Sequence, residues 1–149
     1  MKTLVALVAM TVAASAESAP GVASEQRAKM NWMLNCQGCH LPDATGSRGG
    51  APSMVDDVAR FLSVEGGREY LTRVPGVANA GLANDQLAEL LNWTLATFDR
   101  RHMPADFEPF TAEEIATGRA RPLVSDAALM REALKKKLPA SRTKSTGGE

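Results

Sequence analysis

The feature that most constrains this chain is the five-residue run Cys36-Gln37-Gly38-Cys39-His40, which contains both cysteines of the sequence. Two thiols at this spacing can bond to the two vinyl groups of one porphyrin, while the adjacent imidazole reaches its iron. A disulfide between them would add little stability, because the loop that it closes in the unfolded chain is tiny. We therefore predict one covalently attached haem c, held by Cys36 and Cys39, with His40 as a ligand to the iron.

Two other chemistries use the same pattern. A thioredoxin-like redox pair would place the thiols at the start of a helix that follows a strand. Half of a zinc site would need two further ligands, yet the chain has no other cysteine and only one other histidine, His102. Both alternatives stay open at this point, with haem favoured.

The N-terminus indicates export. Lys2 precedes an apolar run from Leu4 to about Ala14, and the small residues Ala14-Ser15-Ala16 follow, as in a secretory signal peptide. We predict that residues 1–16 are removed and that the mature protein is periplasmic, where covalent haem attachment takes place. The alternative is an uncleaved N-terminal anchor, but the run is short for a membrane span. No later segment is apolar enough to cross a membrane, so the protein is not expected to be membrane-embedded.

Apolar spacing predicts an all-α fold. The clearest helix covers residues 84–98, where one face carries Leu87, Leu90, Leu91, Leu95 and Phe98. A second helix, capped by Ser24, leads into the cysteine motif, and shorter helices are expected at 55–62 and 68–73. No stretch alternates as a strand does.

A chain of 149 residues supports one domain, and its aromatic content of 5% leaves few large side chains for a core that a haem would help to fill. We expect the domain to cover residues 24–122. Its part from about residue 100 would wrap back over the rest, because Phe107, Phe110 and Ile115 are too few for a separate core. Residues 123–149 are expected to form a basic, disordered tail.

Between residues 24 and 98 the chain resembles the class I c-type cytochromes. A helix leads into the cysteine motif, a glycine-rich loop ends at Pro52, and an amphipathic helix with a late aromatic residue follows. The resemblance implies a small cytochrome c-like helical domain around one covalent haem, extended at its C-terminus. It also implies that the Pro52 carbonyl accepts the imidazole proton, that Met54 packs on the haem, and that Trp93 packs against the first helix near Met30 or Met33.

The chain departs from the family at the sixth iron ligand. Family members usually supply a methionine from the loop before the last helix, but here that loop, residues 75–81, has neither methionine nor histidine. We expect Met103 to serve instead, because it lies beside Pro104 in a polar loop where an apolar side chain needs a partner. Met54, His102 and an open position are the alternatives.

The resemblance implies a periplasmic electron-transfer protein and not an enzyme. It would be a carrier, or a small haem subunit, that passes single electrons between a dehydrogenase and a terminal acceptor. The alternative is a haem enzyme or gas-binding sensor with an open distal site. The 17 basic and 17 acidic residues balance, so charge gives no reason to expect nucleic acid as a partner.

Overall fold

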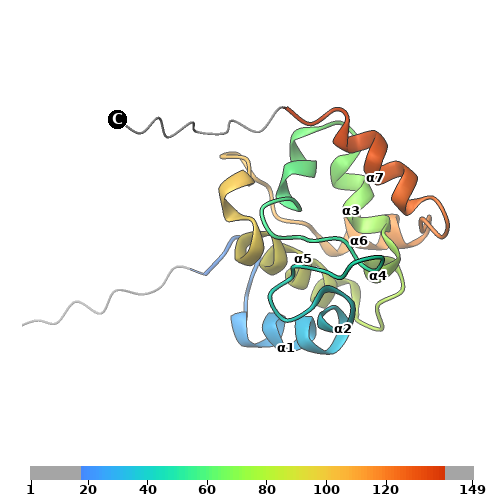
Figure 1. The fold of residues 1–149 in the computed structure, drawn as a ribbon. Coiled ribbons are helices and arrows are strands. Elements are labelled where there is room, and N and C mark those ends of the chain that lie inside the picture. Colours follow the sequence, from blue (N-terminus) through green and yellow to red (C-terminus); the bar gives the residue numbers. More distant parts are fainter. Residues whose placement is uncertain (1–17, 140–149) are drawn as a thin grey trace, which may run out of the picture.

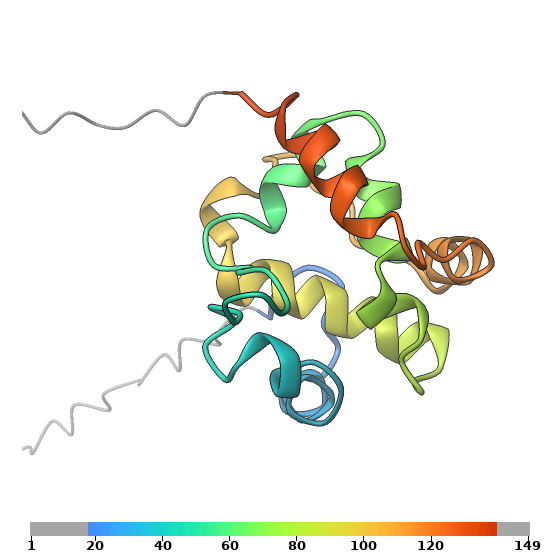
Figure 2. The ribbon, with the colours of Figure 1, turned by 45° about the vertical axis from the view of Figure 1, so that its right-hand side comes forward.

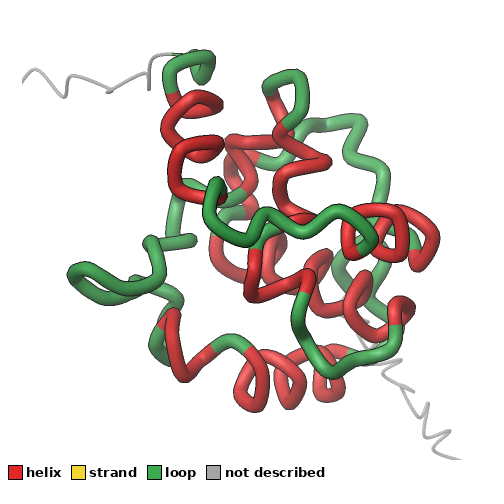
Figure 3. Tube along the Cα trace, turned by 90° about the vertical axis from the view of Figure 1, so that its right-hand side faces the viewer, coloured by secondary structure: helices red, strands yellow, loops and turns green. Residues whose placement is uncertain are grey.

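The computed structural model describes residues 18–139, so the predicted signal peptide, residues 1–16, lies outside the described part of the chain. Every regular element in this range is a helix, and Figure 3 shows only helix and loop. The predicted all-α class is confirmed. The α-helices are α1 (Glu25–Asn35), α2 (Gln37–His40), α3 (Gly67–Arg73), α4 (Pro75–Ala78), α5 (Asn84–Phe98), α6 (Ala112–Arg119) and α7 (Ala127–Lys135), and the 3-10 helices are η1 (Ala59–Ser63) and η2 (Arg100–His102).

Helix α5 forms the centre of the fold (Figure 1). It has the predicted bounds, and every side chain from Leu87 to Ala96 is buried. Such all-round burial requires neighbours on several sides, which α1 and α6 supply. Asp85 lies in its first turn, where a negative charge favours the helix dipole.

Helix α1 is held against α5 by a buried carboxylate. The side chain of Glu89, in the middle of α5, accepts hydrogen bonds from the backbone nitrogens of Ala23 (2.9 Å) and Ser24 (2.8 Å). The guanidinium of Arg27 donates two more, at 2.7 and 2.8 Å. Ser24 caps α1 as predicted, because its hydroxyl accepts from the Arg27 nitrogen. The first turn of α1, and with it the approach to the cysteine motif, is thus fixed by α5.

The segment between the motif loop and α3 differs from the expected helix over 55–62. It is a turn followed by the 3-10 helix η1, Ala59–Ser63. The expected helix would have started at Val55, but the backbone nitrogen of Asp56 bonds to the carbonyl of Phe98 and that of Ala59 to the carboxylate of Asp99. These bonds to the end of α5 replace the regular bonds of an α-helix. The next helix, α3, occupies the expected residues to within one position.

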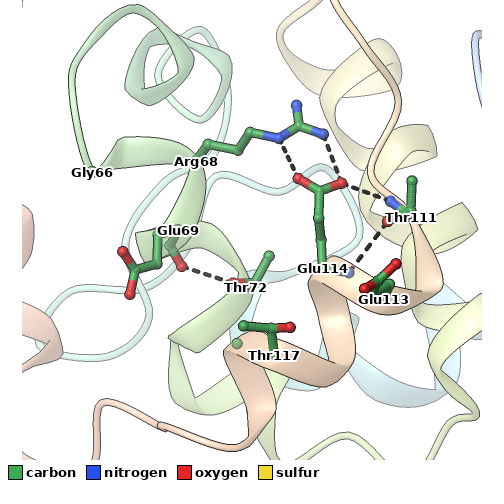
Figure 4. A pocket seen from close by; sticks show the side chains of 9 residues that line it. Gly66, Arg68, Glu69, Thr72, Thr111, Glu113, Glu114 and Thr117 are labelled. Carbon is green, nitrogen blue, oxygen red and sulfur yellow. Dashed lines mark hydrogen bonds and ion pairs between the residues drawn. The ribbon is translucent and has the colours of Figure 1, made fainter.

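Helix α6 lies against α3 and α5, so residues 100–122 wrap over the domain. Thr111 and Glu114 form a capping box at its start. Gly118 permits a close approach to α3, because a Cβ there would lie 2.1 Å from the Thr72 hydroxyl oxygen. A hollow of about 510 Å³ lies between the two helices. Figure 4 shows its lining side chains, among which Arg68 bonds Glu114 through two nitrogens at 2.6 and 3.0 Å.

Residues 123–139 contradict the expectation of a disordered tail. Leu123 is buried and its nitrogen bonds to the carbonyl of Arg73 at 2.9 Å. Helix α7 follows, with Leu134 buried and Arg131 paired with Asp57. The burial of two leucines and one ion pair is enough to hold α7 in place. Its lysine-rich end explains why the sequence did not predict this helix. Residues 140–149 lie outside the described range.

None of the helices between residues 18 and 139 is long and apolar enough to span a bilayer.

Candidate haem site

The cysteine motif lies in one short helical turn directly after α1. Helix α1 ends at Asn35, Cys36 is its C-cap, and the four residues of α2 end at His40. Leu41, with a φ of +65°, breaks the helix and turns the chain into the following loop. Cys36 is half-buried against the core, Cys39 is exposed, and both thiols are free.

The loop after the motif returns to His40. The nitrogen of Gly46 bonds to the carbonyl of His40 at 2.9 Å and that of Met54 to the carbonyl of Ala44 at 2.9 Å. This fold of the loop brings the Pro52 carbonyl to 3.0 Å from Nδ1 of His40. A carbonyl can only accept, so Nδ1 carries the proton and Nε2 keeps a free lone pair. Burial lowers the pKa of His40, although the bond to Pro52 opposes this, and a neutral imidazole is the form that binds iron.

The two rival chemistries fit the site poorly. Burial, and then the neighbouring Cys39, raise the pKa of the Cys36 thiol to about 11. A thiol redox pair needs the opposite, a lowered pKa that keeps one cysteine as thiolate. No group of three or more potential metal-binding side chains occurs between residues 18 and 139, so a zinc site lacks its further ligands there. Two free thiols and one neutral imidazole with a free Nε2 are the donor set that haem c needs.

An aromatic cluster lies beside His40. The ring of Trp32 is centred 6.1 Å from that of His40 and 4.7 Å from that of Phe98. Trp93 meets the Phe98 ring edge-on at 5.6 Å and lies 6.2 Å from Trp32. The cluster joins the end of α1 to the C-terminal half of α5, and so gives the motif a rigid support.

Trp93 contacts the first helix close to the expected residues. Its partner is Trp32, which is buried and directly precedes Met33, whereas Met30 and Met33 are themselves 55% and 49% exposed. The buried face of α1 consists of Ala28 and Trp32. Their spacing of four residues is the signal that could have identified Trp32 from the sequence.

The proposed sixth ligands all lie in the segments next to the Pro52 loop. Met54 is half-buried within that loop. Met103 and His102 follow the end of α5, where His102 bonds Asp99 at 2.5 Å. Asp99, almost fully buried, also accepts from the nitrogen of Ala59 at 2.8 Å. The residues just before Met103 are therefore tied through Asp99 to Ala59 at the start of η1.

Nδ1 of His40 faces the Pro52 carbonyl, so Nε2, on the other edge of the ring, is free to bind a metal. Met103 as the sixth ligand stays a prediction, with Met54, His102 and an open position as its alternatives.

The opposite end of α5 offers no ligand of the usual kind. Figure 2 shows the loop over residues 41–58 near the C-terminal end of α5 and the connection over 74–83 at its N-terminal end. That connection places the partly buried apolar side chains of Val74, Val77, Ala80 and Leu82 against the core. It contains no sulfur atom and no imidazole.

Curated proteins with a similar sequence include two named Cytochrome c-552, both from Thermus thermophilus. One is 32% identical over 121 residues, which cover 69% of this chain and 82% of that protein. The other is 33% identical over 106 residues, which cover 59% of this chain and 81% of that protein. No protein-family model matches the chain. No solved structure gives a significant match.

Proposed function

Because this chain belongs to the class I c-type cytochrome family, we propose that it passes single electrons between a periplasmic dehydrogenase and a terminal acceptor, as a free carrier or as a small haem subunit. In this family haem c is bound covalently, and when bound it supplies an iron that changes between the ferrous and ferric states. Cys36 and Cys39 would form the thioether bonds and His40 would bind the iron through Nε2.

One observation carries the proposal: the Pro52 carbonyl lies 3.0 Å from Nδ1 of His40. The bond fixes the plane of the imidazole, keeps the proton on Nδ1 and makes Nε2 a better donor to iron. A ligand held in this way moves little when the charge of the iron changes, as an electron carrier requires. We propose that Met54, two residues after Pro52, supports the haem by packing. Trp93 would do so through its contact with Trp32.

The test uses protein matured with the machinery for c-type cytochromes. Haem should stay with the chain after extraction with acidified acetone, and one electron per chain should be taken up reversibly. The double variant Cys36→Ala, Cys39→Ala should release its haem on extraction. Loss of haem from the wild type, or irreversible reduction, would overturn the proposal. Mass spectrometry of the mature protein tests the proposed cleavage after Ala16 and the periplasmic location.

A second function is favoured by one specific observation, the lack of sulfur and imidazole in the connection over 74–83. A haem with only His40 as protein ligand would bind a small molecule at its sixth position, as an enzyme or a gas-binding sensor does. The two functions differ in their spectra. The ferric electron carrier with a methionine ligand has a weak long-wavelength sulfur-to-iron band, whereas the open site lacks this band and the reduced protein binds carbon monoxide.

A further inference from the structure

Helix α7 packs on the rest of the fold with one side only. Its inner side carries the buried Leu134 and the half-buried Arg131, and the helix contacts α3. Its outer side exposes Leu129 to 73%, and Val124, just before the helix, is 83% exposed. Lys136 follows Leu129 by seven residues, which is two helical turns, so the two side chains lie on the same side of the helix.

The positive charge of the chain is concentrated in the same segment. Lys135, Lys136 and Lys137 are exposed, and none of them forms an ion pair with the residues that the structure describes. Residues 123–149 hold six basic and three acidic residues, whereas residues 17–122 hold ten basic and fourteen acidic residues. The balanced total therefore conceals an acidic body with a basic end.

The type of basic residue favours a lipid surface over an acidic protein. Nine of the ten basic residues in 17–122 are arginines, whereas four of the six in 123–149 are lysines. Interfaces between proteins are enriched in arginine and aromatic residues and depleted in lysine, and residues 123–149 contain no aromatic residue. A lysine ammonium is a strongly hydrated point charge, which suits attraction to many lipid phosphates more than a fixed pair with one carboxylate.

The acidic side chains of α7 weaken this attraction only in part. Glu132 lies 3.7 Å from the guanidinium of Arg131, so its charge is partly compensated. Asp126, the N-cap, lies at the other end of the helix from the three lysines. The lysine end therefore keeps a positive charge close to an exposed leucine, the combination that peripheral membrane helices use.

The location of α7 leaves the attachment motif free. Figures 1 and 2 both show α7 on the side of the molecule away from α1 and α2. Cys36, Cys39 and His40 lie in and beside α2. A surface that contacts α7 would therefore not cover the motif.

We propose that α7 docks on an anionic phospholipid bilayer, where Lys135, Lys136 and Lys137 contact the headgroup phosphates and Leu129 enters the boundary between headgroups and acyl chains. The contact is peripheral and reversible, and it holds the cytochrome at a membrane surface with its attachment motif facing the solvent. It does not depend on the attachment of haem, so it can fail while the proposed electron transfer holds.

The experiment measures the binding of the mature, haem-loaded protein to sedimented vesicles. One set of vesicles mixes phosphatidylglycerol with phosphatidylcholine, and the other is phosphatidylcholine alone. The first variant is the triple substitution Lys135→Gln, Lys136→Gln, Lys137→Gln. Its matched control removes three positive charges from exposed side chains in other elements: Lys29→Gln, Arg48→Gln, Arg100→Gln. The variant Leu129→Gln tests the apolar contact at a side chain whose exposure makes it dispensable for folding.

We expect the wild type to bind the anionic vesicles and not the neutral ones, and to bind less well as salt screens the charges. Each lysine at an anionic surface strengthens binding about fivefold, so the triple lysine variant should bind about 100-fold more weakly. Leu129→Gln should bind about tenfold more weakly, because it removes one apolar side chain from the contact. The control variant should stay close to the wild type.

Three results would overturn the proposal. The first is a wild type that does not bind the anionic vesicles. The second is an equal loss in both triple variants, which would assign the attraction to the net charge of the whole molecule. The third is unchanged binding of Leu129→Gln, which would exclude insertion into the bilayer. Binding to beads that carry polyglutamate, measured alongside, would in that case identify an acidic protein as the fitting partner.

Discussion

The carboxylate of Glu89 offers the sharpest test of how this fold supports its site. Burial alone would raise the pKa of Glu89, but the bonds from Arg27, Ser24 and Ala23 lower it below the ordinary value. The variant Glu89→Gln keeps the volume of the side chain and removes its charge. Any loss of stability then reports on the hydrogen bonds and not on a cavity.

The size of the loss follows from the four bonds. In Glu89→Gln the backbone nitrogens of Ala23 and Ser24 would bond a neutral amide oxygen in place of a carboxylate. Each of these two bonds would then lose about half of the 1.5–3 kcal/mol that a charge-assisted bond contributes. The pair with Arg27 adds little to this loss, because that side chain is half exposed and water replaces part of the interaction. We expect the free energy of unfolding at pH 7 to fall by about 1.5–3 kcal/mol in total.

The assay is urea unfolding of the haem-loaded protein, followed by circular dichroism and by haem absorbance. Glu69→Gln is the control, because Glu69 pairs with Arg73 and Arg121 at the surface, where a loss of less than about 1 kcal/mol is expected. A group whose pKa is lowered by folding stabilises the protein above its unfolded pKa, and this contribution is lost as the pH falls through the folded pKa. The difference between Glu89→Gln and wild type should therefore shrink in acid. The reasoning is refuted if the Glu89 and Glu69 variants lose the same stability at pH 7.

Three further substitutions test other parts of the structure. Trp32→Ala should cost about 3–5 kcal/mol in urea unfolding, because it opens a cavity between α1 and α5, and a cost under about 1 kcal/mol would contradict the buried cluster. Leu134→Ala should cost about 2–5 kcal/mol if α7 is docked and nothing if residues 123–139 are a free tail, which calorimetry decides. Met103→Leu should abolish the weak long-wavelength sulfur-to-iron band of the ferric spectrum, and an unchanged spectrum would exclude Met103 as the sixth ligand.

Several helices were within reach of the sequence because local patterns encode them. Leucine spacing identified α5 and the hydroxyl of Ser24 identified the start of α1, whereas the bond between His40 and the Pro52 carbonyl was implied by the resemblance to class I c-type cytochromes. These features depend on period, capping chemistry and a motif, all of which act over a few residues.

The remainder depended on contacts between distant segments. The end of α5, which leads to Met103, is held by the bond from Ala59 to Asp99, forty positions apart, and no pattern near Met103 reveals this bond. The position of α7 depends on Leu123 and Leu134, which are buried. The lysines and small residues around them give no sign of this burial in the sequence. In the sequence, Arg119 looks like an ordinary charged residue at the end of a helix. Only the structure shows that it donates hydrogen bonds to carbonyls of residues 78–82.

The pair of Arg27 and Glu89 also bears on the order of events during biogenesis. It joins positions 62 residues apart, so Arg27 lacks this partner until the chain through α5 is present and a long loop has closed. If the chain is exported as proposed, with its N-terminus first, Cys36 and Cys39 would emerge well before α5. The thiols would then be undocked and accessible to the attachment machinery, and folding would follow attachment.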